Sequence, residues 1–225
     1  MAPVSARGGL NRMAGGVLGL ASGVFLAGCS TFGVRSAEEP PYRAVTRVGT
    51  VEIRSYGPRL AAEAVVGGDQ IAARGTGFRR LAGYIFGANR SRATIAMTAP
   101  VTKGKGADIA MTAPVDQSPE PNGEWRIRFF MPASYTRETL PEPLDAGVRI
   151  VTVPGQTVAV LRYSGVPSAG AVRDANAKLL GALTGSGWDA AGTPTAWFYD
   201  PPWTLPPLRR NEAVVTVTQH GSAGK

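Results

Sequence analysis

The sequence predicts an α+β fold in which short strands outnumber helices and a strand–helix–strand order occurs twice. The chain has 29 Gly and 18 Pro, and runs rich in Val, Ile, Tyr and Trp lie between these turn formers, which is typical of short strands. Two segments with helical spacing each follow a break and a capping residue. With 225 residues, 44% of them hydrophobic, the chain is long enough for one sizeable core, and we expect a single folded domain.

The first half begins with a strand at Val51–Arg54, where Val and Ile alternate with charged residues. A turn at residues 56–58 leads to a second strand over residues 60–66. Asp69 then follows a Gly-Gly break as the N-cap of a helix that reaches Gly87. The apolar positions that recur at helical spacing are Ile71, Phe78, Leu81 and Ile85.

Two glycines, Gly75 and Gly77, interrupt this helix. Each costs about 1 kcal/mol relative to Ala in a helix interior. Either the first half of the helix is weak, or a neighbour approaches it closely, and that neighbour is the sheet or a flat ligand.

The segment after the helix carries the same seven residues twice, at 95–101 and at 109–115. The two copies predict the arms of a hairpin or two adjacent edge strands. Pro100 and Pro114 donate no backbone hydrogen bond, so each must lie at a strand end, an edge or a bulge. Alternation from Trp125 to Phe129 then predicts a half-buried strand.

From Gly147 the earlier order recurs. Strands are predicted over residues 148–153 and 157–163, and Ser168 caps a second helix whose apolar face is formed by Val172, Ala175, Leu179 and Leu183. Strands over 195–199 and 213–218 complete the pattern. The sequence therefore predicts a pseudo-duplicated unit whose halves share an order of elements rather than residues.

The first 28 residues predict a signal peptide, because Arg7 and Arg12 precede a short apolar stretch that ends in the lipobox Leu26–Cys29. The alternative is a free tail with a chance cysteine, but Cys29 is the only cysteine in the chain. We expect lipidation at Cys29, a linker over 29–41, a domain over 42–218 and a disordered tail over 219–225. Ser30 resembles the residue that follows the lipidated cysteine in outer-membrane lipoproteins, so the expected location is the periplasmic face of that membrane.

The composition of the chain restricts the kinds of ligand and partner that we expect. Removal of residues 1–28 lowers the formal charge from +8 to +6, and the remaining arginines are scattered rather than clustered with stacking aromatics, so nucleic acid is not an expected partner. An acidic ligand or anionic lipid head groups remain open. With one cysteine the mature domain has no disulfide and no covalent haem attachment motif. No catalytic triad, P-loop or zinc motif is present, and we expect a protein that is not an enzyme.

Four segments in order resemble the SOUL/haem-binding-protein family: residues 51–58, 77–85, 97–101, and 199–203 followed by 209–212. The resemblance covers roughly residues 42–217. It implies a distorted antiparallel β-barrel flanked by two helices, a groove between a helix and nearby loops, and non-covalent binding of haem or another tetrapyrrole. The histidine proposed as the iron ligand in some members corresponds to Ser55 here, and the only histidine is His220 in the tail, so the axial ligand stays open.

The resemblance implies a site between the first helix and the loop after Tyr199. Arginines there are candidates to pair with the propionates, and the apolar helix residues and an aromatic pair are candidates to contact the ring. Two methionines are candidates to contact the ring or to ligate its iron, and a tyrosine is the other candidate axial ligand. Solvated arginines, core packing and a bracing loop are the alternatives. The candidates are Phe78, Arg79, Arg80, Leu81, Ile85, Met97, Met111, Tyr199, Trp203, Arg209 and Arg210.

Two other functions remain open at this point. One is a structural or adaptor lipoprotein whose barrel binds another protein, which the serine at position 55 favours. The other is an enzyme acting on a tetrapyrrole or a lipid-like substrate, for which the sequence offers no catalytic constellation.

Overall fold

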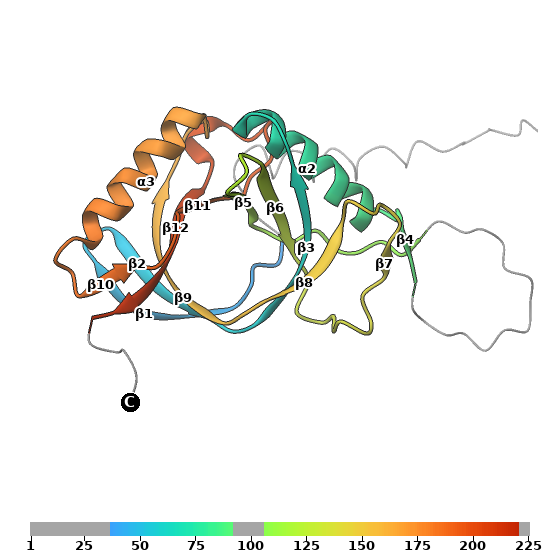
Figure 1. Cartoon of the computed structure of the whole chain (residues 1–225), viewed down its shortest axis with the longest axis horizontal. Helices are drawn as coiled ribbons and strands as arrows, with labels where there is room; N and C mark the ends of the chain where they lie inside the picture. Colours follow the sequence, from blue (N-terminus) through green and yellow to red (C-terminus); the bar gives the residue numbers. More distant parts are fainter. Residues whose placement is uncertain (1–36, 92–105, 221–225) are drawn as a thin grey trace, which may run out of the picture.

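The computed structural model describes residues 37–91 and 106–220 (Figure 1). The described residues contain two α-helices, α2 (Gln70–Ile85) and α3 (Ala169–Leu183), and neither is long and apolar enough to cross a membrane. The strands are β1 (Tyr42–Val48), β2 (Val51–Tyr56), β3 (Arg59–Val66), β4 (Asn89–Arg90), β5 (Val115–Pro119), β6 (Trp125–Phe130), β7 (Glu142–Pro143), β8 (Arg149–Val153), β9 (Gln156–Tyr163), β10 (Trp188–Ala190), β11 (Thr195–Phe198) and β12 (Asn211–Gln219).

Ten of these strands form one antiparallel sheet in the order β1-β2-β9-β12-β11-β5-β6-β3-β8, with β10 on β12. The sheet is strongly curved, and both helices lie on its convex side (Figure 1). The predicted α+β class with a dominant antiparallel sheet and two helices is confirmed.

The curvature comes from two bends. Tyr56 pairs with Gln156, and Arg59 pairs with Val153, so the β2–β9 and β3–β8 ladders keep one register across the corners at 57–58 and 154–155. Pro and Gly at both corners suit this geometry, because Pro donates no ladder hydrogen bond and Gly tolerates tight turns. The hydrogen-bonded path among the described strands is open from β1 to β8, so a closed barrel stays a prediction, which these continuous bent ladders favour.

The pairing pattern repeats in the two halves. In the first half β3 pairs with β6, and β6 with β5; in the second, β9 pairs with β12, and β12 with β11. The two halves meet where β5 pairs with β11. The predicted strand–helix–strand repeat is therefore present in the topology, and the β5–β11 pair is its central junction.

Helix α2 begins where the sequence predicted, because Asp69 accepts hydrogen bonds from the backbone N–H groups of Ile71 and Ala72. Its apolar face was only partly predicted. Leu81 and Ile85 are buried, but Ile71 and Phe78 are 44% and 38% exposed. Gly77 faces the sheet instead, so close that a Cβ atom there would lie 2.3 Å from Cγ1 of Ile127. The close neighbour of Gly77 is thus the sheet.

Helix α3 follows the prediction closely. Ser168 accepts a hydrogen bond from the backbone N–H of Ala171 as its N-cap. All four predicted apolar positions, Val172, Ala175, Leu179 and Leu183, are buried. Three of them pack against β2, β9 and β12 in one hydrophobic cluster.

The strand predictions differ from the structure in the repeated heptapeptide and in three strands that were missed. The second heptapeptide, 109–115, is not a strand; it makes only an isolated bridge from Thr112 to Glu38 before β5 starts at Val115. The first copy, 95–101, lies outside the described residues. Strands β1, β5 and β10 were not predicted. Strand β1 is exposed over nearly its whole length and shows no alternation of buried positions, β5 is mostly polar, and β10 has only three residues.

Candidate functional site

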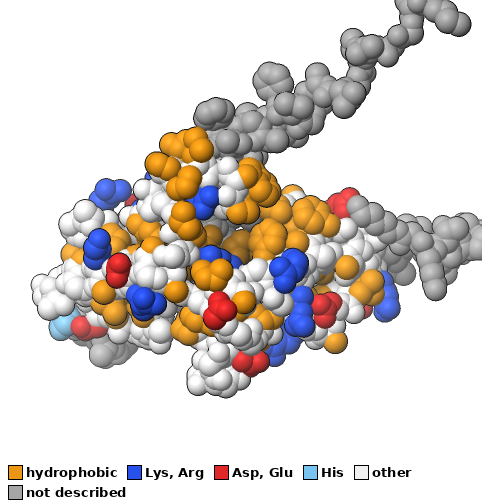
Figure 2. Space-filling view, turned by 90° about the horizontal axis from the view of Figure 1, so that it is seen from above, with side chains coloured by type: hydrophobic (Ala, Val, Ile, Leu, Met, Phe, Trp, Pro, Cys, Tyr) orange, Lys and Arg blue, Asp and Glu red, His pale blue; other side chains and the backbone are white. Residues whose placement is uncertain are grey.

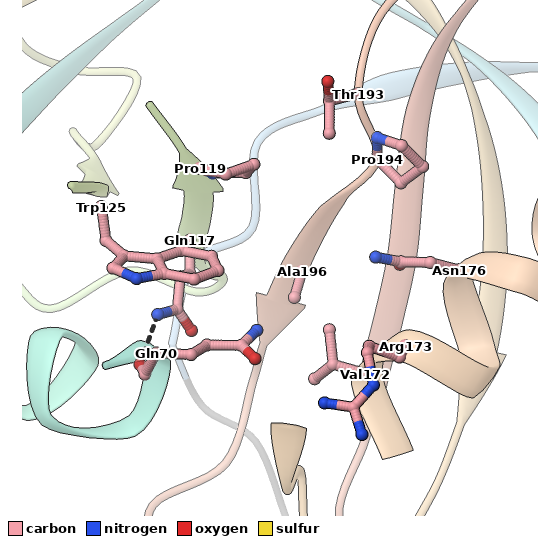
Figure 3. A pocket seen from close by; sticks show the side chains of 10 residues that line it. All are labelled: Gln70, Gln117, Pro119, Trp125, Val172, Arg173, Asn176, Thr193, Pro194 and Ala196. Atoms are coloured by element: carbon pink, nitrogen blue, oxygen red, sulfur yellow. Dashed lines mark hydrogen bonds between the residues drawn. The ribbon is translucent and has the colours of Figure 1, made fainter. Parts of the chain in front are cut away.

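A pocket of about 120 Å³ lies at the junction of the two halves (Figure 3). Its floor is formed by Gln117 of β5 and Ala196 of β11, which pair directly across the two strands. Helix α2 covers β3 and β6, and α3 covers β9 and β12, so the central strands are left between the helices. The pocket therefore exists because each helix packs on its own half of the sheet.

The walls combine an aromatic ring with amides. Trp125 closes one side, while Val172, Arg173 and Asn176 of α3 close the other. Figure 3 shows the side chains of Gln117 and Asn176 directed toward the space between the lining residues.

Gln117 is the most constrained polar group of the pocket. It is 1% exposed, and its Nε2 donates to the backbone carbonyl of Gln70 at 2.6 Å. Its Oε1, like Oδ1 of Asn176, has no hydrogen-bond partner among the described residues. A buried acceptor without a donor costs roughly 1–3 kcal/mol, so the pocket favours a molecule that brings a donor.

Arginine and apolar side chains surround the pocket. Arg173 is exposed at its mouth, and Ile71 is exposed beside Gln70. Arg74, one turn along α2, stacks 4.5 Å over the ring of Phe198 and donates to the carbonyl of Pro167. Figure 2 looks onto this helix-bearing face and shows hydrophobic side chains next to Lys and Arg around a hollowed area.

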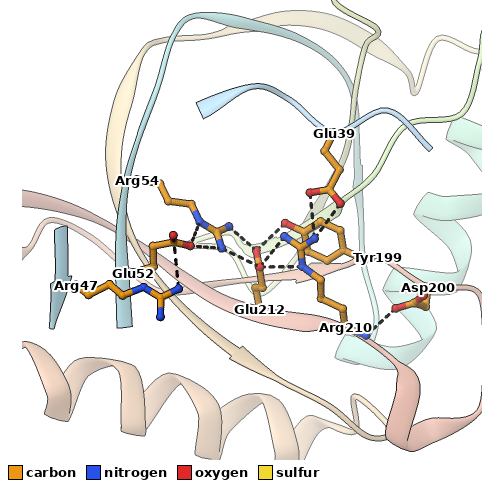
Figure 4. A network of polar contacts seen from close by, with 8 residues as sticks. All are labelled: Glu39, Arg47, Glu52, Arg54, Tyr199, Asp200, Arg210 and Glu212. Carbon is orange, nitrogen blue, oxygen red and sulfur yellow. Dashed lines mark hydrogen bonds and ion pairs between the residues drawn. The ribbon is translucent and has the colours of Figure 1, made fainter. Parts of the chain in front are cut away.

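The concave side of the sheet holds a different polar cluster (Figure 4). Glu212, fully buried, accepts hydrogen bonds from Arg54 at 3.0 and 3.2 Å, from the Tyr199 hydroxyl at 2.6 Å and from Arg210 at 3.0 Å. Arg210 also pairs with Glu39 at 2.8 Å, so the cluster ties the start of the described chain to β12.

Burial and charge act together on this cluster. Burial alone would lower the pKa of the Arg54 guanidinium, but the attraction and hydrogen bonds of Glu212 raise it overall. Burial and the negative charge of Glu212 raise the pKa of the Tyr199 phenol well above its usual value. Both groups therefore keep their protons, and their hydrogen bonds to Glu212 hold the cluster together.

The candidates predicted on the first helix are spread over its surface and its core. Arg79 is exposed and donates to Thr76, while Arg80 lies 3.9 Å from Asp145 with both side chains nearly half exposed. Phe78 packs edge-on against Phe129. Leu81 and Ile85 are buried in the core under α2, facing the sheet rather than any pocket.

The candidates after β11 are mostly engaged by the protein itself. Tyr199 and Arg210 belong to the Glu212 cluster. Arg209 donates to the carbonyls of Thr204 and Pro202 and so braces its own loop. Trp203 is 63% exposed on that loop. Within residues 37–91 and 106–220, no hydrogen bond or ion pair joins Arg79 or Arg80 to Arg209 or Arg210.

The candidate iron ligands give no common site. Met97 lies outside the described residues, and Met111 is 42% exposed. His220 pairs with Asp189 at 3.0 Å with 70% of its side chain exposed, at the end of β12, which extends one residue into the predicted tail. Ser55 pairs with Thr157 in the sheet. The described part of the chain contains no group of three or more His, Cys, Asp or Glu side chains arranged to hold a metal.

Sequence reasoning missed the junction residues Gln117, Arg173 and Asn176. A glutamine in a short strand between buried positions was a signal for a polar site, but that strand was itself not predicted. Which residues meet at the junction depends on the pairing of β5 with β11, about 80 residues apart in sequence.

Solved structures share this fold at low identity. The C-terminal domain of EcmrR aligns with 79% of this chain and 98% of its own, with a TM-score of 0.50 and 11% identity. EcmrR in its complex with DNA aligns with 75% of this chain at a TM-score of 0.52 and 10% identity, and there the match spans 57% of the longer EcmrR chain. A hydrolase from Listeria innocua aligns at a TM-score of 0.47 and 11% identity, over 75% of this chain and 92% of its own. The EcmrR matches show a shared fold.

A search among curated proteins found no match. The sequence model of one family, described as SOUL heme-binding protein, matches residues 37–216 of the 225-residue chain. That range includes both helices and reaches into the last strand. The chain therefore belongs to the SOUL heme-binding protein family, in agreement with its sequence motifs.

Proposed function

We propose that this protein binds haem or a related tetrapyrrole without a covalent bond, on its helix-bearing face at the junction of the two halves. The observation that carries the proposal is the family match over residues 37–216. The junction adds a pocket, an aromatic wall and an arginine at the mouth, which are groups that suit a planar ligand with carboxylates. The proposed role is binding rather than catalysis.

The size of the pocket limits how such a ligand is held. Pockets that enclose drug-sized ligands measure roughly 300–1,000 Å³, whereas the junction pocket measures about 120 Å³. It fits one edge of a tetrapyrrole, and the rest of the ring would lie on the surface near Ile71 and Arg74. The buried acceptors Gln117 Oε1 and Asn176 Oδ1 do not suit a carboxylate, so the propionates belong at Arg173 outside the pocket.

The chemistry favours binding through the ring plane and its carboxylates rather than through iron. The chain has one histidine, His220, which is paired with Asp189, and one cysteine, Cys29, and neither a methionine nor a tyrosine is among the residues that line the junction pocket. Ferric haem and metal-free protoporphyrin should then bind with similar affinity, within a few fold. A strong preference for haem would point to an axial ligand and contradict this mode.

Titrations of the protein with ferric haem, followed by the Soret band, test the site. Arg173→Ala should weaken binding by tenfold or more, because a hydrogen bond to a charged group contributes roughly 1.5–3 kcal/mol and 1.4 kcal/mol is tenfold. Arg80→Ala and Arg209→Ala test the site implied by the family resemblance, and His220→Ala is the control for ligation. No saturable binding by micromolar parent protein would refute the proposal and favour an adaptor role.

We further propose that Cys29 carries lipid and anchors the domain to the cell envelope, at the periplasmic face of the outer membrane. The support is the lipobox at residues 26–29 behind a short apolar stretch. Cys29→Ala should leave an unprocessed precursor that is absent from the lipoprotein fraction. Unchanged processing and fractionation in this variant would remove the anchor.

A further inference from the structure

The junction pocket presents acceptors that a closed tetrapyrrole ring does not satisfy. The orientation of the Gln117 amide is fixed, because only its NH₂ group donates to the carbonyl of Gln70, which leaves Oε1 as an acceptor. Oε1 and the Oδ1 of Asn176 are both without a partner among the described residues. The missing group is therefore an N–H or O–H donor.

Tetrapyrroles differ in where they carry donors. In a closed ring the pyrrole N–H groups face the centre, and the periphery carries apolar substituents and propionates, which are acceptors when ionised. An open-chain tetrapyrrole ends in two lactam rings, each with an N–H and a carbonyl at the end of the molecule. A terminal lactam can therefore donate to a buried amide oxygen, whereas the edge of a closed ring cannot.

We propose that the junction pocket binds the terminal lactam ring of an open-chain tetrapyrrole, with the lactam N–H donating to Gln117. The inference rests on the proposed tetrapyrrole binding and names the ligand class. The volume of about 120 Å³ suits one ring rather than a whole ligand. Trp125 lines the same pocket and offers a flat apolar wall to that ring, and Arg173 at the mouth pairs with a propionate of the part outside.

The pocket has room for water, but Gln117 Oε1 has almost no accessible surface, so a lactam reaches it only with a small shift of the amide. The bound lactam then brings a donor on a ring that stacks on Trp125. Affinity for an open-chain ligand should therefore depend on both the amide of Gln117 and the free space above Ala196. If the pocket holds only water, substitutions at these two positions should not change the affinity.

The test compares biliverdin with ferric haem, using the full chain and absorbance titration. Biliverdin should bind more tightly than haem, and Gln117→Leu should weaken biliverdin binding about tenfold while haem affinity changes less than threefold. Ala196→Leu, which fills the pocket from the partner strand and leaves Gln117 intact, should weaken the binding of both ligands about tenfold. Gln156→Leu, on β9 and away from the pocket, is the matched control, and thermal melts confirm that each variant is folded.

The outcomes separate the two proposals. Biliverdin that binds no more tightly than haem, or equally well to the parent and to both pocket variants, overturns the lactam site while tetrapyrrole binding stands. Absence of binding for both ligands overturns tetrapyrrole binding itself, and the lactam site with it.

Discussion

The two faces of the curved sheet are stabilised in different ways. On the convex face, side chains such as Ile127 and Phe129 of β6 pack under α2 in an apolar cluster. On the concave face, their neighbours in the same strand include Arg128, which pairs with Glu63 at 2.6 Å. The convex face thus depends on shape complementarity with the helices, whereas the concave face combines an apolar cluster with buried charges whose pairing affects stability.

The buried arginines of the concave face differ in how many hydrogen-bond partners they have. Arg54 shares Glu212 with Tyr199 and Arg210, whereas Arg59, across the bend, has no hydrogen-bond partner for any of its guanidinium nitrogens among the described residues. Arg59 lies over the rings of Tyr56 and Phe130 at 4.2 and 4.4 Å instead. Burial lowers the pKa of Arg59, while the phenols of Tyr56 and Tyr199 and the carboxylate of Asp116 act in the opposite direction. Aromatic faces therefore hold Arg59, whereas the carboxylates of Glu212 and Glu52 hold Arg54.

The largest effect is expected from Glu212→Gln. This variant leaves the Arg54 and Arg210 guanidinium groups buried without their shared carboxylate, and loss of one partner of a buried ion pair costs about 3–5 kcal/mol. The free energy of unfolding in denaturant measures the loss. The double variant Arg54→Met/Glu212→Leu should be less destabilised than Glu212→Gln; a loss below 1 kcal/mol for Glu212→Gln would mean that the concave face does not depend on this cluster.

On the convex face, Gly77→Ala should destabilise the protein by about 1–3 kcal/mol, despite the higher helix propensity of Ala. The added Cβ would lie 2.3 Å from Cγ1 of Ile127, so α2 must move away from β6. Gly75→Ala is the control in the same helix, because the nearest atom to its Cβ is Nη1 of Arg79 at 3.5 Å. That variant should gain about 0.5–1 kcal/mol, and thermal melts of the two should shift in opposite directions.

Arg59→Met should change the free energy of unfolding by less than about 1 kcal/mol, or raise it. The aromatic contacts of the guanidinium contribute roughly 0.5–2 kcal/mol, and the cost of burying its charge without an acceptor opposes them. Arg54→Met, in contrast, should cost about 3–5 kcal/mol because it leaves Glu212 short of a partner. Equal losses in these two variants would show that both arginines are held in the same way.

The smallest expected effect is the change that Asp116 causes in the pH dependence of the free energy of unfolding. Burial raises the pKa of the Asp116 carboxyl above its ordinary value, and the nearby Arg128 only partly offsets this. The folded state therefore binds the Asp116 proton more tightly than the unfolded state does. The stabilisation of the fold by the protonated carboxyl is fully present below the ordinary pKa of about 3.8, and it is lost as the pH rises through the raised pKa.

Asp116→Asn should accordingly increase stability at neutral pH and flatten the fall in stability between the ordinary pKa and neutrality. Denaturant midpoints of parent and variant across this pH range measure the difference. A variant that is less stable than the parent at neutral pH would mean that the ion pair with Arg128 outweighs the cost of burial.

The sequence by itself determined the local elements and the family. Asp69 and Ser168 predicted both helix starts, alternation predicted β2 and β6, and the recurring order of elements predicted β8 and β9. The ordered motifs predicted the SOUL family. These features depend on residues a few positions apart, where propensity, capping and alternation act directly.

Only the tertiary structure decided which faces of these elements meet. The bend between Tyr56 and Arg59 shifts the alternation, so that Tyr56 and Ala61 line the same concave cluster although they differ by an odd number of positions. The contacts that form the junction pocket and the Glu212 cluster join residues far apart in the chain, such as Gln117 with Ala196 and Arg54 with Glu212. Such contacts are fixed by strand pairing and register, which no local pattern in a single sequence specifies.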